Sequence, residues 1–207
     1  MAEEPARPLW QLAAAGACGL DEVGRGALAG PLVAAAVVLP RDFTHPLLRD
    51  SKLLSEKQRE AIEPAIRREA MAVQVISIEV AEIDDQGVGW ANRVAFERLI
   101  EAVTAPEYLG DGNLAIRTQR QYRSVIGGDR LVPAISAASI VAKVYRDRLM
   151  RELHPHFAHY DWEHNKGYGS PHHLSAISRH GICHHHRRSF IHREQPGLFD
   201  QLVTDRV

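Results

Sequence analysis

The sequence predicts an α/β fold: a mixed sheet flanked by helices, with a C-terminal helical appendage. Three short apolar or alternating stretches, 17–23, 31–39 and 72–80, have the pattern of strands. Helix patterns and shorter strand patterns then alternate through the middle of the chain. Strands in succession, followed by strand and helix units, are typical of a mixed α/β sheet.

Each element can be justified in order along the chain. The first three strands are expected to form an antiparallel meander, with a glycine-rich turn between the first two. A helix begins after Ser55, which can cap it, and Pro64 predicts a kink or a break in that helix. Residues 88–104 carry apolar side chains at helical spacing and predict a helix that crosses over the sheet.

The second half predicts two shorter strands and then mainly helix. The strands are expected at 108–110 and 122–126, where they would bring Asp111 and Asp129 to strand ends, and a long helix at 133–150. From His154 onward the chain is rich in His, Gly and Pro, with a helix at 171–180. We therefore expect a tail (1–15), a core domain (16–153), a helical segment (154–192) and a second tail (193–207).

Residues 19–31 are the most informative stretch of the chain. An apolar run delivers Asp21 and Glu22 into the turn Gly24-Arg25-Gly26. Consecutive strand residues point to opposite faces, so both carboxylates reach one site only where the strand ends or bulges. The glycines allow close backbone approach to a ligand, and the arginine fork suits phosphate oxygens. Metal and phosphate chemistry is one interpretation, and a surface turn with an incidental acidic pair is the other.

Composition limits the classes of function. The chain has 207 residues and a net charge of −1, but residues 143–193 hold nine Lys or Arg against four Asp or Glu, a charge of +5 that leaves −6 elsewhere. A basic segment for phosphates and an acidic one for cations suit a nuclease. No apolar stretch approaches the roughly 20 residues that span a bilayer, and the acidic N-terminus is unlike a signal peptide. We therefore expect a cytoplasmic chain with no membrane partner, whose Cys18 and Cys183 are reduced and structural.

Further blocks follow the first in a fixed order. They are Asp50 to Ser55, Asp111-Gly112-Asn113, Gly128-Asp129, Ile135 to Asp147, Lys166 to Ser170 and His186 to Phe190. Alone, Asp111-Gly112 would be an ordinary turn. As an ordered set, from about residue 16 to about residue 190, the blocks resemble bacterial ribonuclease HII. The resemblance implies a ribonuclease H-like fold, and four acidic residues that hold divalent metal: Asp21, Glu22, Asp111 and Asp129.

The resemblance also implies an activity. It predicts an endoribonuclease that cuts the RNA strand of RNA–DNA hybrids and incises 5′ to single ribonucleotides in duplex DNA, as in ribonucleotide excision repair. Two ions, Mg²⁺ or Mn²⁺, would activate water and stabilise the leaving 3′ oxygen, giving 5′-phosphate and 3′-hydroxyl ends. We expect a monomer. Ribonuclease HIII, which usually carries an extra N-terminal domain, and a non-catalytic hybrid-binding module are the rivals; about 15 residues before the first strand and four retained carboxylates argue against them.

Substrate contacts follow from the same resemblance. Gly24, Arg25 and Gly26 would read the 2′-hydroxyl through the backbone, and Tyr168 would pack on the next sugar, unless it is a core aromatic. Asp147 receives a supporting role. The phosphate-holding candidates, each with surface charge as its alternative, are Lys52, Lys143, Lys166, Arg187 and Arg188. The triplet His184-His185-His186 suggests substrate contact or exposure rather than zinc.

Two residues depart from the family pattern, and a third feature lies in the tail that follows it. Gly127 stands where relatives often have Lys, and loss of the lysine would weaken a phosphate contact. Gly110 stands where an apolar residue is usual, and loss of that side chain would loosen the strand before Asp111. In the tail, Gln195, Leu198 and Phe199 resemble the peptide by which bacterial repair proteins dock on the sliding clamp. The alternative is that the two apolar side chains pack back onto the domain.

Overall fold

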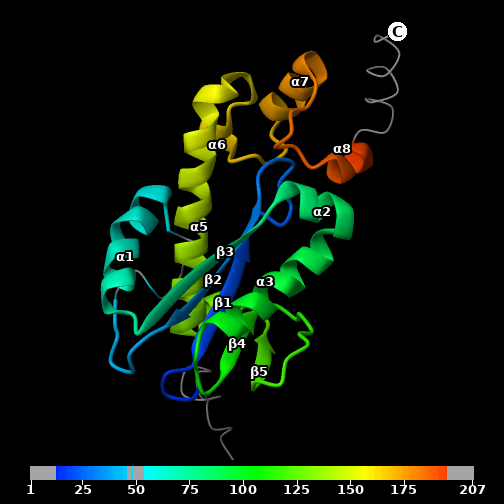
Figure 1. Cartoon of the computed structure of the whole chain (residues 1–207). Coiled ribbons are helices and arrows are strands. Elements are labelled where there is room, and N and C mark those ends of the chain that lie inside the picture. Colours follow the sequence, from blue (N-terminus) through cyan, green and yellow to red (C-terminus); the bar gives the residue numbers. More distant parts are fainter. Residues whose placement is uncertain (1–12, 46–47, 49–53, 195–207) are drawn as a thin grey trace, which may run out of the picture. The chain divides into compact units, whose positions relative to one another are not determined.

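A computed structural model describes residues 13–45, 48 and 54–194, and within them a five-stranded sheet of order β3-β2-β1-β4-β5 (Figure 1). The strands are β1 (Cys18–Val23), β2 (Leu32–Val38), β3 (Ala72–Ile78), β4 (Tyr108–Asp111) and β5 (Tyr122–Val125). β1 pairs with β4, and β4 with β5, in parallel. The predicted mixed α/β sheet is confirmed, and each strand begins and ends within two residues of its predicted limits.

Eight helices accompany the sheet in the described part of the chain. They are α1 (Glu56–Glu69), α2 (Val80–Gln86), α3 (Val88–Ala102), α4 (Gly128–Leu131), α5 (Pro133–Leu153), α6 (Trp162–Asn165), α7 (Pro171–His180) and α8 (Arg188–Glu194), with short 3-10 turns at His154–His156 and Ala158–Tyr160. The helices predicted after Ser55 and at 88–104, 133–150 and 171–180 are confirmed, and the short helices α2, α4, α6 and α8 were not predicted.

The expected break at Pro64 is wrong, because α1 continues through it. Ser55 and Gln58 form a capping box at the N-terminus of the helix. Ile62 and Ile66 are buried, whereas Pro64 is exposed. The carbonyl one turn before the proline can therefore hydrogen-bond water, and burial of the opposite face holds the helix together.

The chain divides into two compact units. Unit 1 comprises Met1–Val23, Ala34–Ile76 and Arg93–Val144, and unit 2 comprises Gly24–Val33, Ser77–Asn92 and Tyr145–Val207. One apolar cluster of unit 1 joins β4 and β5 to the start of α5 through Leu109, Val125 and Ile135. Unit 2 has a separate core, in which Leu28, Met150, Tyr160, Trp162, Ile177 and Ile191 are buried together. No helix within the described residues is long and apolar enough to cross a membrane.

Gly110 has a packing reason in the structure. A Cβ built there would lie 2.6 Å from the Tyr122 hydroxyl oxygen and 2.9 Å from Phe96 Cε2. These two rings occupy the space that a side chain would fill, so the expectation of a loosened strand is wrong. The glycine allows the rings to pack on β4 directly ahead of Asp111.

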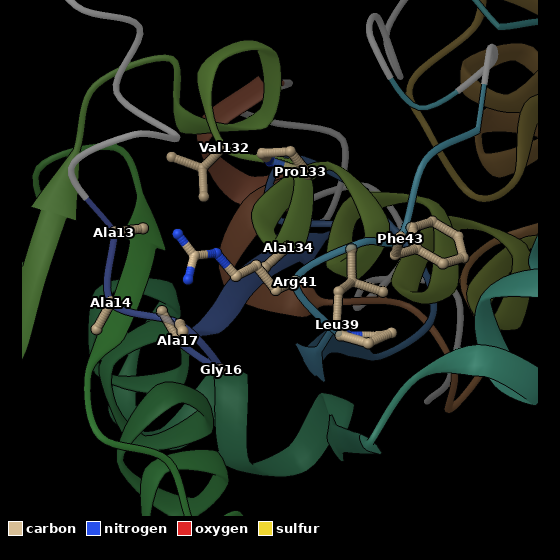
Figure 2. Close-up of a pocket in the computed structure, with 12 residues that line it drawn as sticks. Ala13, Ala14, Gly16, Ala17, Leu39, Arg41, Phe43, Val132, Pro133 and Ala134 are labelled. Atoms are coloured by element: carbon tan, nitrogen blue, oxygen red, sulfur yellow. The ribbon is translucent and has the colours of Figure 1, made fainter.

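Unit 1 also contains a pocket of about 390 Å³ beside β1 and α5 (Figure 2). Arg41 lies among its lining residues, most of which are small or apolar, such as Leu39, Val132 and Pro133. The described residues that line this pocket include none of the four carboxylates of the candidate site described next.

Candidate functional site

Strand register brings two of the predicted carboxylates to one level of the sheet. β1 and β4 are paired at Leu20 and Gly110, and Asp21 and Asp111 each follow by one residue. In parallel strands, residues at one level project to the same face. Asp21 is buried, and Glu22, the next residue, is half-buried and donates its backbone N–H to Asp21 Oδ1 at 2.8 Å.

Two acidic neighbours affect the charge of Asp21. Burial raises the pKa of this carboxyl well above its usual range, and the charges of Glu22 and Asp111 raise it further. The Ser139 hydroxyl, on α5, lowers it by hydrogen bonding. Three carboxylates thus share one electrostatic environment in unit 1.

Asp129 reaches the same group from a different element than the sequence predicted. It lies within the short helix α4, not at the end of β5, and is completely buried. Its backbone N–H donates to Asp111 Oδ1 at 3.4 Å. Gly127 has a φ of +66° at the N-terminus of α4, a conformation in which a lysine would be strained. The turn between β5 and α4 therefore explains the departure at Gly127 and places the backbone N–H of Asp129 against the Asp111 carboxylate.

These four residues, Asp21, Glu22, Asp111 and Asp129, are called the carboxylate cluster below. Their donor atoms are the hard oxygens that Mg²⁺ and Mn²⁺ prefer, and their mutual repulsion is the kind that a cation relieves. As the side chains stand, no group of three or more His, Cys, Asp or Glu within the described residues is placed to hold a metal ion. The cluster fits a divalent metal by donor chemistry and by electrostatic coupling.

The glycine turn, residues 24–31, belongs to unit 2 and is held through its backbone. Gly24 has a φ of +85°, and its N–H donates to the Tyr168 hydroxyl oxygen at 3.2 Å. Arg25 and Gly26 are exposed. The structure thus brings together two parts of the predicted substrate contact, the turn and Tyr168. Tyr168 is half-buried, so its exposure is intermediate between that of a substrate contact and that of a core aromatic.

Arg187 is not an exposed phosphate ligand in this structure. It is completely buried, and its guanidinium donates to Gly30 O at 3.0 and 2.8 Å and to Arg25 O at 3.1 Å. Burial, and then the charge of Arg146, lower the pKa of Arg187 to about 9. Both readings given to this residue, phosphate contact and solvated surface charge, disagree with that placement.

Arg146 is the main residue that the sequence reasoning missed. It is completely buried and donates to the carbonyls of Ala29, Pro31 and Lys166 at 2.9, 2.9 and 2.8 Å. An arginine within an Ala- and Ile-rich helix was the available signal. Arg146 and Arg187 are called the arginine brace below.

Lys166 is buried, and its ammonium donates to the carbonyl of Glu163, so the structure gives it a local role in its own turn. Lys143 is half-buried and Arg188 exposed. Asp147 is buried, and its charge favours the charged form of Arg146. Lys52 and the tail residues Gln195, Leu198 and Phe199 lie outside the described residues.

Two buried histidines, His173 and His186, lie next to the backbone of Tyr168. Trp162 Nε1–H donates to His173 Nε2 at 3.1 Å, so the proton of His173 is on Nδ1, which lies 2.9 Å from the carbonyl of Tyr168. Cys183 N–H donates to His186 Nδ1 at 3.0 Å, so His186 Nε2–H points at His173 Nε2, 3.1 Å away. Burial, then His173, lower the pKa of His186 to about 3. His186 is therefore a neutral core residue; of the triplet, only His184 is exposed.

The mixed sheet, with Asp21 and Asp111 at one level near the ends of β1 and β4, has the ribonuclease H-like fold. The family model "Ribonuclease HII" matches residues 18–194. The chain belongs to the ribonuclease HII family. It is accordingly an endoribonuclease that acts on RNA–DNA hybrids and depends on divalent metal.

Individual relatives agree with this assignment. Ribonuclease HII of Burkholderia thailandensis and that of Burkholderia pseudomallei K96243 are each 49% identical over 181 residues, which cover 84% of this chain and 82% of the relative. The PCNA:RNase HII complex from Archaeoglobus fulgidus matches with a TM-score of 0.75 at 22% identity, over 88% of this chain and 96% of that chain. Bst-RNase HIII in complex with Mn²⁺ matches at 0.71 and 19%, over 98% and 74%. These structural matches show the fold alone.

Proposed function

We propose that this enzyme incises 5′ to single ribonucleotides embedded in duplex DNA, as well as cutting longer hybrids, by two-metal catalysis. The observation that supports it is the electrostatic coupling of Asp21 to Glu22 and Asp111, together with the hydrogen bond from the backbone N–H of Asp129 to Asp111. The carboxylate cluster would hold Mg²⁺ or Mn²⁺. When bound, the ions supply an activated water and stabilise the leaving 3′ oxygen, so that the products carry 5′-phosphate and 3′-hydroxyl ends.

The glycine turn and Tyr168 would recognise the ribonucleotide. A 2′-hydroxyl both donates and accepts, so the backbone of exposed Arg25 and Gly26 can distinguish it from deoxyribose. The Tyr168 ring would pack on the following sugar and favour deoxyribose there. Its hydrogen bond from Gly24 supports this division, because it keeps the ring next to the turn.

Phosphates would be held by the cationic side chains that the structure leaves at the surface. Exposed Arg25 and Arg188 and half-buried Lys143 are the described candidates, with Lys52 added from the sequence. Lys166 and Arg187 would act indirectly, through the backbone that they bind. Asp147 keeps a supporting role beside Arg146.

One assay separates the parts of this proposal. Two duplexes of the same sequence, one with a single ribonucleotide and one with a continuous RNA strand, would be incubated with Mg²⁺, with Mn²⁺ and with EDTA. We expect metal-dependent cleavage of both, with the single-ribonucleotide product ending 5′ to the ribonucleotide. Cleavage of the hybrid alone would contradict junction recognition, and cleavage in EDTA would contradict the metal role.

We also propose that the tail docks on the sliding clamp and that the enzyme works as a monomer in the cytoplasm, where bacterial DNA is replicated. The supporting observations are the spacing of Gln195, Leu198 and Phe199 and the existence of a PCNA complex for the Archaeoglobus protein. Calorimetry of a peptide covering 190–207 against a purified bacterial clamp tests it. Binding that disappears with Leu198→Ala and Phe199→Ala together is expected; no binding at high micromolar concentration would remove this partner.

A further inference from the structure

Arg146 touches both parts of the proposed ribonucleotide reader. Its three carbonyl partners come from the glycine turn, at Ala29 and Pro31, and from Lys166, two residues before Tyr168. Its guanidinium carbon lies 5.3 Å from the centre of the Tyr168 ring. One side chain thus binds the turn and the tyrosine segment at the same time.

The same arginine explains the first glycine of the motif. A Cβ built on Gly24 would lie 2.2 Å from Arg146 Nε and 2.8 Å from its Cδ. Any larger residue at position 24 would displace the guanidinium, in addition to the strain that a φ of +85° imposes on it. Gly24 is therefore required by contact with Arg146 as well as by the turn.

A purely space-filling role would not need an arginine. Burying a charge is costly unless its hydrogen bonds are satisfied, and an apolar side chain of similar length would fill the same volume more cheaply. The planar fork of arginine can donate in several fixed directions at once, which a lysine ammonium cannot reproduce. The burial of Arg146 therefore fixes the relative positions of three backbone carbonyls.

We propose that Arg146 is a positioning residue for ribonucleotide recognition: it sets the glycine turn and Tyr168 in the arrangement that reads the junction. This inference rests on the proposed roles of the turn and Tyr168. Arg146 does not touch the substrate. It acts through Gly24, through the carbonyls that it binds and through the face of the Tyr168 ring.

The first test is Arg146→Lys, with Arg148→Lys as the matched control on an exposed position of the same helix. Thermal melting verifies the fold, and kcat and KM are measured on the single-ribonucleotide duplex and on the hybrid. We expect Arg146→Lys to lower kcat on the single ribonucleotide by about tenfold to a hundredfold, with KM changed little and the hybrid affected much less. Equal losses on both substrates, or no loss, would overturn the proposal.

Gly24→Ala provides a second route if Arg146→Lys does not fold. The added methyl displaces the guanidinium without removing it, so we expect the same selective loss on the single ribonucleotide. Where both variants fold, the double variant should lose much less than the product of the two single losses, because both act on one contact. Independent, multiplicative losses would overturn the proposal.

Tyr168→Ala, measured beside these variants, distinguishes the positioning role of Arg146 from the proposed recognition of the ribonucleotide by the glycine turn and Tyr168. If Tyr168→Ala loses selectivity for the single ribonucleotide and Arg146→Lys keeps it, the positioning role alone is wrong. If Tyr168→Ala keeps selectivity, the reader itself is wrong, and Arg146 has nothing to position. Loss of selectivity in both supports both.

Discussion

The carboxylate cluster of unit 1 and the arginine brace of unit 2 both bury charge, and they compensate it differently. Asp21 is surrounded by like charges that, after burial, raise its pKa. Arg146 and Arg187 are instead satisfied by backbone carbonyls within their own unit. Every guanidinium nitrogen of the arginine brace donates to a backbone carbonyl, whereas we expect the cluster to be stabilised by a cation. Under the proposed function, charge in the first region would serve chemistry, and charge in the second would serve geometry.

The largest effect should come from removing one charge from the cluster. We expect Asp21→Asn or Asp111→Asn to lower cleavage of both substrates more than about a hundredfold, because metal charge stabilisation is worth several kcal/mol. Asp85→Asn, at an exposed position of α2, is the matched control and should cleave normally. Near-normal turnover of either cluster variant with Mg²⁺ present would contradict the metal assignment.

The next effect concerns the ring of Tyr168. Tyr168→Ala should lower turnover of a single embedded ribonucleotide by about tenfold to a hundredfold, while duplex affinity changes little, because the ring orients the substrate. Tyr168→Phe keeps the ring and removes the acceptor for Gly24 N–H, so it should lose less. Equal losses of affinity and turnover in Tyr168→Ala would indicate a core role instead.

In the arginine brace, the effect should appear as stability. Arg187→Met should lower the free energy of unfolding by about 2 kcal/mol, because the carbonyls of Gly30 and Arg25 lose buried donors. Arg188→Met, one residue further and exposed, should change it by less than about 0.5 kcal/mol. Urea unfolding measures both, and equal effects would show that the guanidinium of Arg187 contributes no specific hydrogen bonding.

The buried histidine pair should make the protein sensitive to mild acid. An unfolded histidine binds a proton near pH 6.5, but folded His186 does so only near pH 3, so between these values the unfolded state holds more protons. Stability is full above pH 6.5 and falls as pH decreases, by up to about 1.4 kcal/mol per pH unit for this residue. Urea unfolding of the wild type and of His186→Gln from pH 7 to 5 isolates the contribution of His186. If the free energy of unfolding falls equally with pH in both proteins, His186 is not the buried neutral group proposed.

Much of this fold and of the cluster was predictable from the sequence, for local reasons. The strands are short apolar runs bounded by turn residues, and register in parallel strands places Asp21 and Asp111 at one level. Asp129 lies beside Asp111, although it is in α4 rather than at a strand end. A four-residue helix carries too little periodicity to be seen in the sequence.

The arginine brace could not be predicted in the same way. A sequence shows that Arg146 and Arg187 are charged, which favours the surface, and the partners that allow their burial are backbone carbonyls. Every residue has a carbonyl, so no side-chain pattern marks the acceptors. The glycine at position 24 was assigned to ligand approach for the same reason, since its contact with Arg146 depends on tertiary structure.

The smallest effect should be a gain of stability. Without metal, Asp21→Asn should raise the free energy of unfolding by about 1 kcal/mol, the usual scale of a stabilising substitution, because it removes a buried charge beside Glu22 and Asp111. In a chain of this size that is roughly 2 to 4 °C in Tm. Glu107→Gln is the control of opposite sign: that buried carboxylate is paired with Arg123 at 3.0 Å, so its neutralisation should lower the stability of the protein. Adding Mg²⁺ should then raise the Tm of the wild type more than that of Asp21→Asn, since a ligand that binds the folded state more tightly stabilises it more. A lower Tm for metal-free Asp21→Asn would mean that the cluster is satisfied within the protein, as the arginine brace is, and the contrast between the two regions would fail.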